Sequence, residues 1–261
     1  MKAHRTEAIV LHTYPARERD KLVVFLTPDL GKRKGWAYGA RSIKSRFGAS
    51  LEPLSKVRIG YMEKETDEVV RIQSIDLIRS LFPAQQNLLA NVAATYLAET
   101  IDTFAQPDDP SEVIYRLLDR GAEALLSGRP PLAVVAYAEI WILKLTGVFP
   151  SLKQCTECGN PLERPLRFDP MKSGFVCDGC SGRGVEVFPN ELLDELSLVL
   201  KLPVEEFAAH PPSPAMIFEI RSLAASIRRS FLGHELKSYE VLAGIHDDVS
   251  PPLPGGERGQ R

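Results

Sequence analysis

Residues 155–180 read CTECGNPLERPLRFDPMKSGFVCDGC and contain every cysteine of the 261-residue chain. Two residues lie within each cysteine pair and eighteen lie between the pairs, which are Cys155 with Cys158 and Cys177 with Cys180. A two-residue gap lets a tight turn aim both sulfurs at one point, and Zn²⁺ accepts four thiolates tetrahedrally at about 2.3 Å. Gly159 and Gly179 supply the backbone freedom that such turns need. The spacing predicts one structural zinc ion per chain.

Two other interpretations of these cysteines fit less well. Disulfides are typical of oxidising compartments, whereas the N-terminus has no apolar run resembling a signal peptide and no stretch approaches a membrane span. A redox Cys-x-x-Cys needs only one pair near a βαβ pattern, and this chain has two pairs and no such pattern. Four thiolates also leave no open position for catalysis. We therefore expect a cytoplasmic protein, without a membrane partner, whose metal stabilises the fold.

The overall composition is that of a globular protein, with 44% hydrophobic and 25% charged residues in a chain long enough for two domains. The net charge of −2 conceals an uneven distribution. Residues 1–80 carry 16 Lys and Arg against 10 Asp and Glu, which leaves 16 against 24 for the rest. A polyanion would meet the basic N-terminal part, although charge alone leaves nucleic-acid binding and simple solvation equally open.

The first eighty residues have the pattern of short β-strands. Five runs rich in β-branched and aromatic residues are separated by turn-forming residues: 4–14, 19–27, 31–40, 56–64 and 68–79. The last run also admits a helical interpretation, because Ile72, Ile75 and Ile78 recur every three residues. Five short strands without an intervening helix predict a small antiparallel barrel over residues 1–80.

Beyond Pro83 the apolar residues recur at helical spacing, which predicts a helical domain over residues 81–246. Helices are expected over 89–104 and from Ser111 to about residue 126, and the segment after Pro131, LAVVAYAEIWILKLTGVF, is apolar nearly all round. Such a helix is buried, so we expect it to form the core of this domain. Two more helices should follow the cysteine loop, which is expected over 151–183, with starts at Pro189-Asn190 and Ser213-Pro214. Residues 247–261 are rich in proline, glycine and charge and are expected to be disordered.

The segment 32–47, KRKGWAYGARSIKSRF, combines six basic residues with three aromatic ones and contains no acid. Cations along the phosphates and rings beneath the bases are what single-stranded nucleic acid requires, and arginine adds a bidentate grip on phosphate. Alternatively, Trp36 and Tyr38 belong to the barrel core, because their spacing places both on one face of a strand. The candidate nucleic-acid-binding residues are Lys32, Arg33, Lys34, Trp36, Tyr38, Arg41, Lys44 and Arg46.

Recognisable catalytic patterns are missing from the sequence. It has no phosphate-binding GxxxxGK[ST] loop, and His234-Glu235 lacks the second histidine of a zinc protease. The paired acids at 108–109 and 247–248 lie in proline-rich segments that favour solvated turns. We therefore expect a protein that is not an enzyme.

Two stretches carry a resemblance to a known family, namely EAIVLHTYPARERDKLVVFLTPDLGK (7–32) and YGARSIKSRFGASLEPLSKVRI (38–59). Together with a helical domain interrupted by the doubled Cys-x-x-Cys after Val148-Phe149-Pro150, they resemble the bacterial recombination mediators of the RecO family, which belong to the RecF pathway of DNA repair. The resemblance covers about residues 1–240.

The resemblance implies an N-terminal OB-fold barrel, a helical C-terminal domain and zinc where all four cysteines are kept. It also implies a cytoplasmic, nucleoid-associated protein that binds single-stranded and double-stranded DNA, anneals single strands and loads the RecA recombinase with RecR. A further implied partner is the acidic C-terminal tail of single-strand-binding protein. We expect the helical domain to supply the apolar part of that site, with carboxylates meeting Arg116, Arg120 or Arg129. The acidic balance of this domain argues against a second DNA surface there.

Two further hypotheses remain open. An OB barrel binds RNA as well as DNA, so the chain could be an RNA-binding or ribosome-associated protein with a structural zinc site. It could also be a scaffold for protein interactions in which the barrel is only structural.

Overall fold

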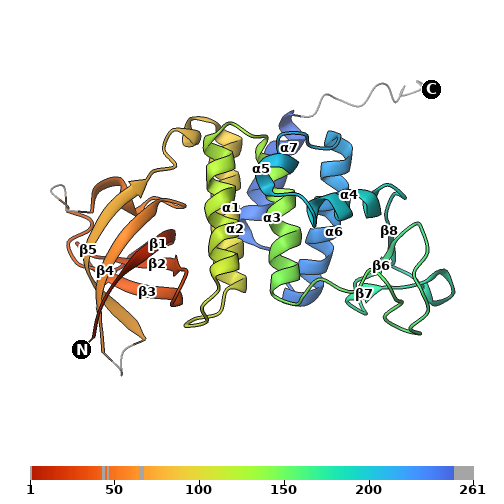
Figure 1. Ribbon diagram of the computed structural model, residues 1–261, viewed down its shortest axis with the longest axis horizontal. Coiled ribbons are helices and arrows are strands. Elements are labelled where there is room, and N and C mark those ends of the chain that lie inside the picture. The colour runs from red at the N-terminus through yellow and green to blue at the C-terminus, as the bar shows by residue number, and fades with distance from the viewer. Residues whose placement is uncertain (1, 43–44, 46, 65–67, 250–261) are drawn as a thin grey trace, which may run out of the picture.

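The computed structural model describes residues 2–42, 45, 47–64 and 68–249. Figure 1 shows three parts in a row, namely a β-barrel, a group of helices and a small second sheet. The fold is thus α+β, as the sequence predicts, with the barrel first in the chain. Lys44 and Arg46, two of the candidate nucleic-acid-binding residues, lie outside the described residues.

The N-terminal barrel closes in the strand order β1-β2-β3-β5-β4. Its strands are β1 Lys2–Pro15, β2 Lys21–Thr27, β3 Gly31–Ala37, β4 Lys56–Glu63 and β5 Val69–Arg79, and a 3₁₀ turn covers Gly48–Leu51. Neighbouring strands are antiparallel except β3 and β5, whose pairing is parallel and closes the barrel. The helical interpretation of residues 68–79 is wrong, because this run forms β5.

Two strands of the barrel are buried on both faces. Ala8 and Val10 point into the barrel core, whereas Ile9 and Leu11 between them pack against the helices. On β2, Val23 and Phe25 likewise alternate with Val24 and Leu26. This double burial explains why both strands read as continuous apolar runs.

The remainder of the chain is mainly helical. The helices are α1 Leu88–Phe104, α2 Glu112–Leu126, α3 Pro131–Leu145, α4 Leu192–Val199, α5 Val204–Phe207, α6 Pro214–Leu232 and α7 Lys237–Val249, with a 3₁₀ turn over Ala84–Gln86 before them. The capping predictions at Ser111 and Ser213 are confirmed, since their hydroxyls accept hydrogen bonds from the N–H groups of Ile114 and Met216. Among the described residues no helix combines the length and apolarity needed to cross a membrane.

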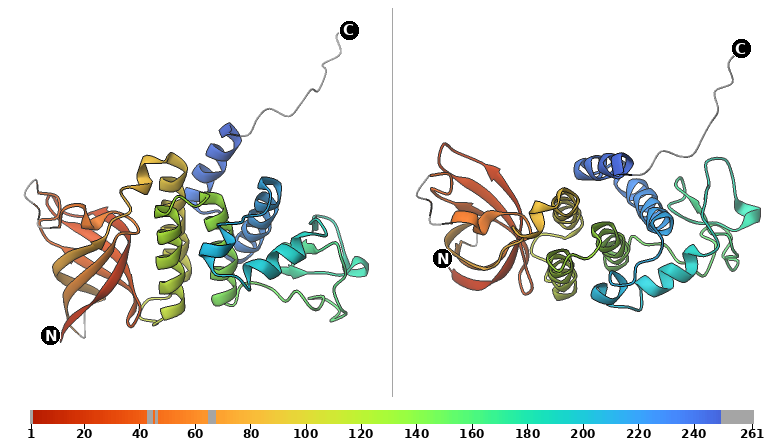
Figure 2. Two further views of the ribbon diagram at one scale, coloured as in Figure 1. Left: turned by 45° about the horizontal axis from the view of Figure 1, so that its top comes forward. Right: turned by 90° about the horizontal axis from the view of Figure 1, so that it is seen from above.

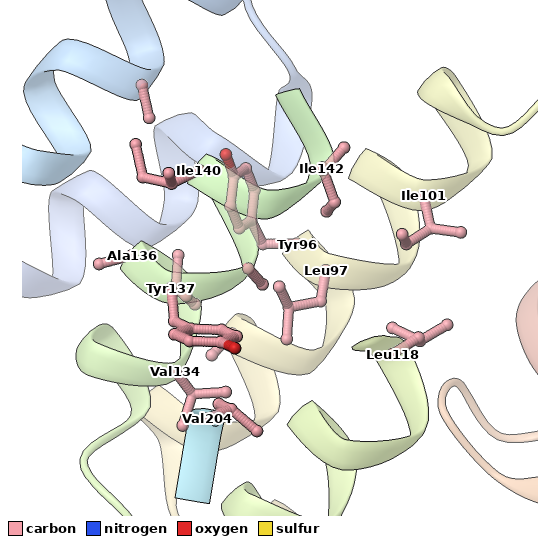
Figure 3. Close-up of a cluster of buried hydrophobic side chains, with 14 of the residues drawn as sticks. Tyr96, Leu97, Ile101, Leu118, Val134, Ala136, Tyr137, Ile140, Ile142 and Val204 are labelled. Carbon is pink, nitrogen blue, oxygen red and sulfur yellow. The ribbon is translucent and has the colours of Figure 1, made fainter. Parts of the chain in front are cut away.

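Helix α3 lies at the centre of the helical part, as its composition predicts. Figure 3 shows its side chains, among them Val134, Ile140 and Ile142, within a cluster completed by neighbouring helices. The cluster continues to Ile9 and Leu26 of the barrel, so one apolar core joins the two parts.

A charged network crosses this core. Glu139 of α3 is 1% exposed, and its carboxylate lies 3.1 Å from a guanidinium nitrogen of Arg228 on α6. The Tyr96 hydroxyl donates to Glu139 and accepts from Arg228, and Glu235 lies 2.6 Å from the same guanidinium. The stacked ring of Tyr239 brings α7 to Arg228, with 4.5 Å between the ring centre and the guanidinium carbon. Four helices therefore share one buried cation.

Ion pairs also connect the barrel to the helices along the boundary between them, which is called the seam below. Asp119 of α2 lies 2.9 Å from the Lys56 ammonium and 2.6 Å from the Arg79 guanidinium. At the far end of the seam, the loop between α1 and α2 touches the start of β3. A side chain at Gly31, whose φ is +66°, would place its Cβ 2.5 Å from the carbonyl oxygen of Asp109. Glycine is therefore required for this close approach.

The second sheet is small and has the order β7-β6-β8. Its strands are β6 Arg167–Asp169, β7 Gly174–Phe175 and β8 Glu186–Val187, and Asp178–Cys180 form a 3₁₀ turn. Both views in Figure 2 place this sheet at the end of the molecule opposite the barrel. The Ser226 hydroxyl donates to Glu186 at 2.5 Å and the Ser230 hydroxyl to the carbonyl of Pro170 at 2.7 Å, which attaches the sheet to α6.

Candidate metal centre and nucleic-acid interface

The four cysteines converge beside the small sheet. Turns in the two Cys-x-x-Cys segments position them: the Gly159 N–H donates to the Cys155 carbonyl at 2.9 Å, and the Cys180 N–H donates to the Cys177 carbonyl at 3.1 Å. Gly159 has a φ of +74°, as its predicted role in the turn requires. All four sulfurs lie within 4.8 Å of one another, and all four thiols are free.

The donor set fits a metal ion. A tetrahedron with metal–sulfur bonds of 2.3 Å has edges of about 3.8 Å, and the sulfurs of Cys158 and Cys177 are 3.7 Å apart. Four thiol ligands fill a tetrahedral shell and leave no position for a substrate. The arrangement can therefore hold a metal ion in a structural role.

Electrostatics also favour a cation among these sulfurs. A backbone N–H of Cys158 is the main cause that lowers the pKa of the Cys155 thiol to about 6. Hydrogen bonds with the sulfurs of Cys158 and Cys177 are the main cause that raises the pKa of Cys180 to about 12. Thiolates this close repel one another, and a bound divalent cation removes that repulsion.

Two of the candidate nucleic-acid-binding residues, Lys32 and Arg33, are held by carboxylates within the chain. The Lys32 ammonium lies 3.2 Å from Asp102 of α1, and only 11% of the lysine side chain is exposed. Arg33 pairs with Asp108 and, at 2.9 Å, with Glu63. Lys32 therefore helps to connect the barrel to α1, and Arg33 connects β3 to the end of β4 and to the loop between α1 and α2.

The aromatic residues Trp36 and Tyr38 lie outside the barrel core. Their neighbours Gly35 and Ala37 are the buried residues of this strand segment. A groove of about 700 Å³ lies beside them and is lined by Trp36, Tyr38, Met62, Lys64, Glu68, Val69 and Arg71. Tyr38 is 42% exposed, and the Arg71 guanidinium carbon lies 5.4 Å from the centre of its ring. The groove thus combines the exposed ring of Tyr38 and the half-buried ring of Trp36 with the cations of Lys64 and Arg71 and the carboxylate of Glu68.

Arg41 continues this surface beyond the end of β3 and brings in residues that the sequence analysis missed. Its N–H donates to the Arg19 carbonyl at 3.0 Å, and its guanidinium donates to the Arg17 carbonyl at 3.2 Å. Arg17 and Arg19 occupy the β1–β2 turn and are exposed, as is Arg41. Their position in the sequence could have identified these two arginines as candidates, because the β1–β2 loop of an OB fold borders its binding face. Lys34 is exposed on β3.

A second groove, of about 440 Å³, lies between α2, α3 and α5. Its apolar lining includes Val113, Leu117, Tyr137, Trp141, Leu145 and Val204. The charged side chains that line it are Arg116, Arg120 and Glu205, whereas Arg129 lines a neighbouring hollow. Two of the three arginines expected beside an acidic peptide thus border an apolar groove.

Comparison with known proteins gives a consistent result over both halves of the chain. The family described as "Recombination protein O N terminal" matches residues 1–81, and "Recombination protein O C terminal" matches residues 85–240. A DNA repair protein RecO from Koribacter versatilis is 32% identical over 241 residues, which are 91% of this chain and 97% of that protein. The protein of the same name from Myxococcus xanthus is 30% identical over 249 residues, with 94% and 99% covered. The chain therefore belongs to the RecO family of DNA repair proteins, and its barrel is an OB fold.

Proposed function

We propose that this protein is a non-enzymatic recombination mediator of the RecF pathway that binds and anneals single-stranded DNA. The observation that carries the proposal is the groove beside β3, where the exposed ring of Tyr38 and the half-buried ring of Trp36 lie with Lys64 and Arg71, and Lys34 is exposed on the same strand. Stacking on exposed rings requires unpaired bases, so this groove favours a single strand. The exposed arginines of the β1–β2 turn and Arg41 extend it along a phosphate backbone, which both single and double strands offer.

The family supports the wider role. As a RecO protein, the chain is proposed to help RecR load the RecA recombinase and to act in the cytoplasm at the nucleoid. The ion proposed for the four cysteines is zinc, because it accepts four thiolates in tetrahedral geometry. This ion lies at the opposite end of the molecule from the proposed DNA surface (Figure 1).

Changing Arg17, Arg19 and Arg41 together to alanine is expected to weaken binding of oligo-dT without unfolding the protein. Each lost phosphate contact lowers the salt slope by about 0.7, so the triple variant should lose about two units of slope. Fluorescence anisotropy at several salt concentrations measures this slope, and strand annealing should slow in parallel. Trp36→Ala should instead cost about 1–3 kcal/mol of binding with little change in slope.

A matched control is the triple alanine variant of Lys2, Arg5 and Arg58, three exposed residues of β1 and β4 that carry the same charge. Equal loss of slope in both triple variants would show that general charge, and not this surface, binds the strand. A matched RNA oligonucleotide that competes better than oligo-dT would favour the RNA-binding hypothesis. If the variant of Arg17, Arg19 and Arg41 binds oligo-dT as tightly as the parent does, the DNA surface lies elsewhere. Lys44 and Arg46 would then be the next residues to change.

We propose that the groove between α2, α3 and α5 receives the acidic tail of single-strand-binding protein. Its apolar lining suits the tail's apolar side chains, and Arg116 and Arg120 offer cations to its carboxylates. Arg116→Ala is expected to weaken binding of a labelled tail peptide about tenfold, which corresponds to about 1.4 kcal/mol.

The control for this experiment is Arg183→Ala, which removes an exposed arginine beside the small sheet. Single-strand-binding protein without its tail should lose the interaction. Equal binding by the intact and the tail-less protein would refute this mechanism.

A further inference from the structure

The groove proposed for the acidic tail contains a carboxylate of the chain itself, that of Glu205 on α5. We propose that Glu205 sets the orientation in which the groove accepts an acidic peptide, by neutralising Arg120 and leaving Arg116 as the open cation. This inference rests on the proposed tail-binding function and assigns a specificity-determining residue to it.

The charge of Arg120 is shared between two carboxylates. Its guanidinium lies 3.4 Å from Glu205 and 3.2 Å from Glu123. The three side chains are 62%, 42% and 41% exposed in the order Arg120, Glu205, Glu123. Exposed pairs of this kind are weak, so a stronger ligand can displace them. Until that happens, Arg120 offers little net charge to a peptide.

Arg116, in contrast, is only weakly paired with a carboxylate. Its one ion pair among the described residues is with Glu112, four residues earlier on α2, at 3.9 Å. This distance is at the limit of an ion pair, and 64% of the arginine side chain is exposed. Because Arg116 and Arg120 lie one helical turn apart, the groove has an open cation at one position and a neutralised one at the next.

The residues that line the groove show at which end each of the two arginines lies. Helices α2 and α3 are joined by a short loop and run in opposite directions, so Val113 faces the Leu145 end of α3 and Arg120 lies level with Tyr137. The ring of Tyr137 contacts that of Phe207 of α5 at a tilt, with 5.8 Å between ring centres, and Glu205 pairs with Arg120, so Glu205 lies at the Tyr137 end. A peptide carboxylate at that end meets repulsion from Glu205, whereas one beside Arg116 meets attraction. The acidic residues of the peptide should therefore lie along Arg116, with apolar residues toward Tyr137.

The test compares the parent, Glu205→Gln and Glu206→Gln. Glu206 is the matched control because it is the next residue of α5, is exposed and does not line the groove. The probes are a labelled tail peptide from single-strand-binding protein and a peptide of the same composition in reversed order. The parent should prefer the tail peptide. Glu205→Gln should bind both peptides about three- to tenfold more tightly, with the larger gain for the reversed peptide, so that the preference shrinks.

Each result has a defined meaning. In the parent, Arg120→Ala should cost less peptide affinity than Arg116→Ala, because Glu205 and Glu123 already neutralise Arg120; an equal cost would overturn the neutralisation of Arg120. Equal peptide affinities for Glu205→Gln and Glu206→Gln would overturn this inference while leaving the proposed tail site intact. If Arg116→Ala binds the tail peptide as tightly as the parent does, the proposed tail site is wrong, and the inference with it. The same holds if neither the parent nor Glu205→Gln binds the peptide.

Discussion

Replacing Cys177 with serine is expected to release the metal ion and to destabilise the part of the chain around the small sheet by several kcal/mol. Apparent zinc-binding free energies in small zinc-binding peptides are about 10–16 kcal/mol, and this binding energy is folding energy. The strands of the small sheet are only two or three residues long, so they supply few hydrogen bonds to replace it. Metal analysis together with thermal unfolding, with and without chelator, measures the effect.

The control for this prediction is Met171→Ser, which changes a side chain that is 91% exposed in the turn between β6 and β7. It should keep the metal and the unfolding temperature of the parent. Protein purified without chelator that contains no zinc would refute the identity of the ion, and a stable, metal-free Cys177→Ser variant would refute its structural role. DNA binding should survive in either case, because the barrel has its own core.

The second large effect is expected from Arg228→Ala. This change removes the cation that Glu139 and Glu235 share, and it leaves the almost fully buried Glu139 with Arg221 alone, at 3.6 Å. Breaking a buried ion pair by removing one partner costs about 3–5 kcal/mol. For a protein of this size, that should lower the unfolding temperature by roughly 6–20 °C, as measured by calorimetry or circular dichroism.

Arg229→Ala is the matched control, because Arg229 is the next residue of α6 and is exposed. Adding Glu235→Gln to Arg228→Ala should restore part of the loss, since the ion pair given for Glu235 is with Arg228 and its charge is otherwise left without a cation. Equal unfolding temperatures for Arg228→Ala and Arg229→Ala would show that the network contributes nothing to stability.

Local patterns in the sequence were sufficient for much of the fold. The cysteine spacing predicted the cluster because a Cys-x-x-Cys turn is determined by its own few residues. The hydroxyls of Ser111 and Ser213 marked two helix starts because an N-cap acts within three residues. Helix α7 was not predicted, and its first turn depends on a distant group, since the Ser238 N–H donates to the Glu99 carboxylate of α1 at 2.8 Å.

The candidate nucleic-acid interface likewise depends partly on local sequence patterns and partly on contacts between distant residues. The sequence marked the basic and aromatic segment after Gly31, but it could not show that Lys32 would meet Asp102, seventy residues later in the chain. Nor could strand alternation place Trp36 inside or outside the barrel, because that depends on which face the closed sheet buries. The β1–β2 turn joins Arg41 only through contacts to the carbonyls of Arg17 and Arg19, which no spacing rule predicts.

The seam between barrel and helices has a consequence for multivalent binding. A flexible linker would let two binding sites wander relative to each other and would dilute the second binding event. Here the shared apolar core, Asp119 with its two cations, and the approach of Gly31 to Asp109 hold the two parts as one body. The barrel groove and the groove on α2 therefore stay at a constant separation. If the barrel binds a DNA strand and α2 binds a tail peptide as proposed, the effective concentration of the second binding event is set by that separation, so avidity depends on whether the DNA-bound partner can span it.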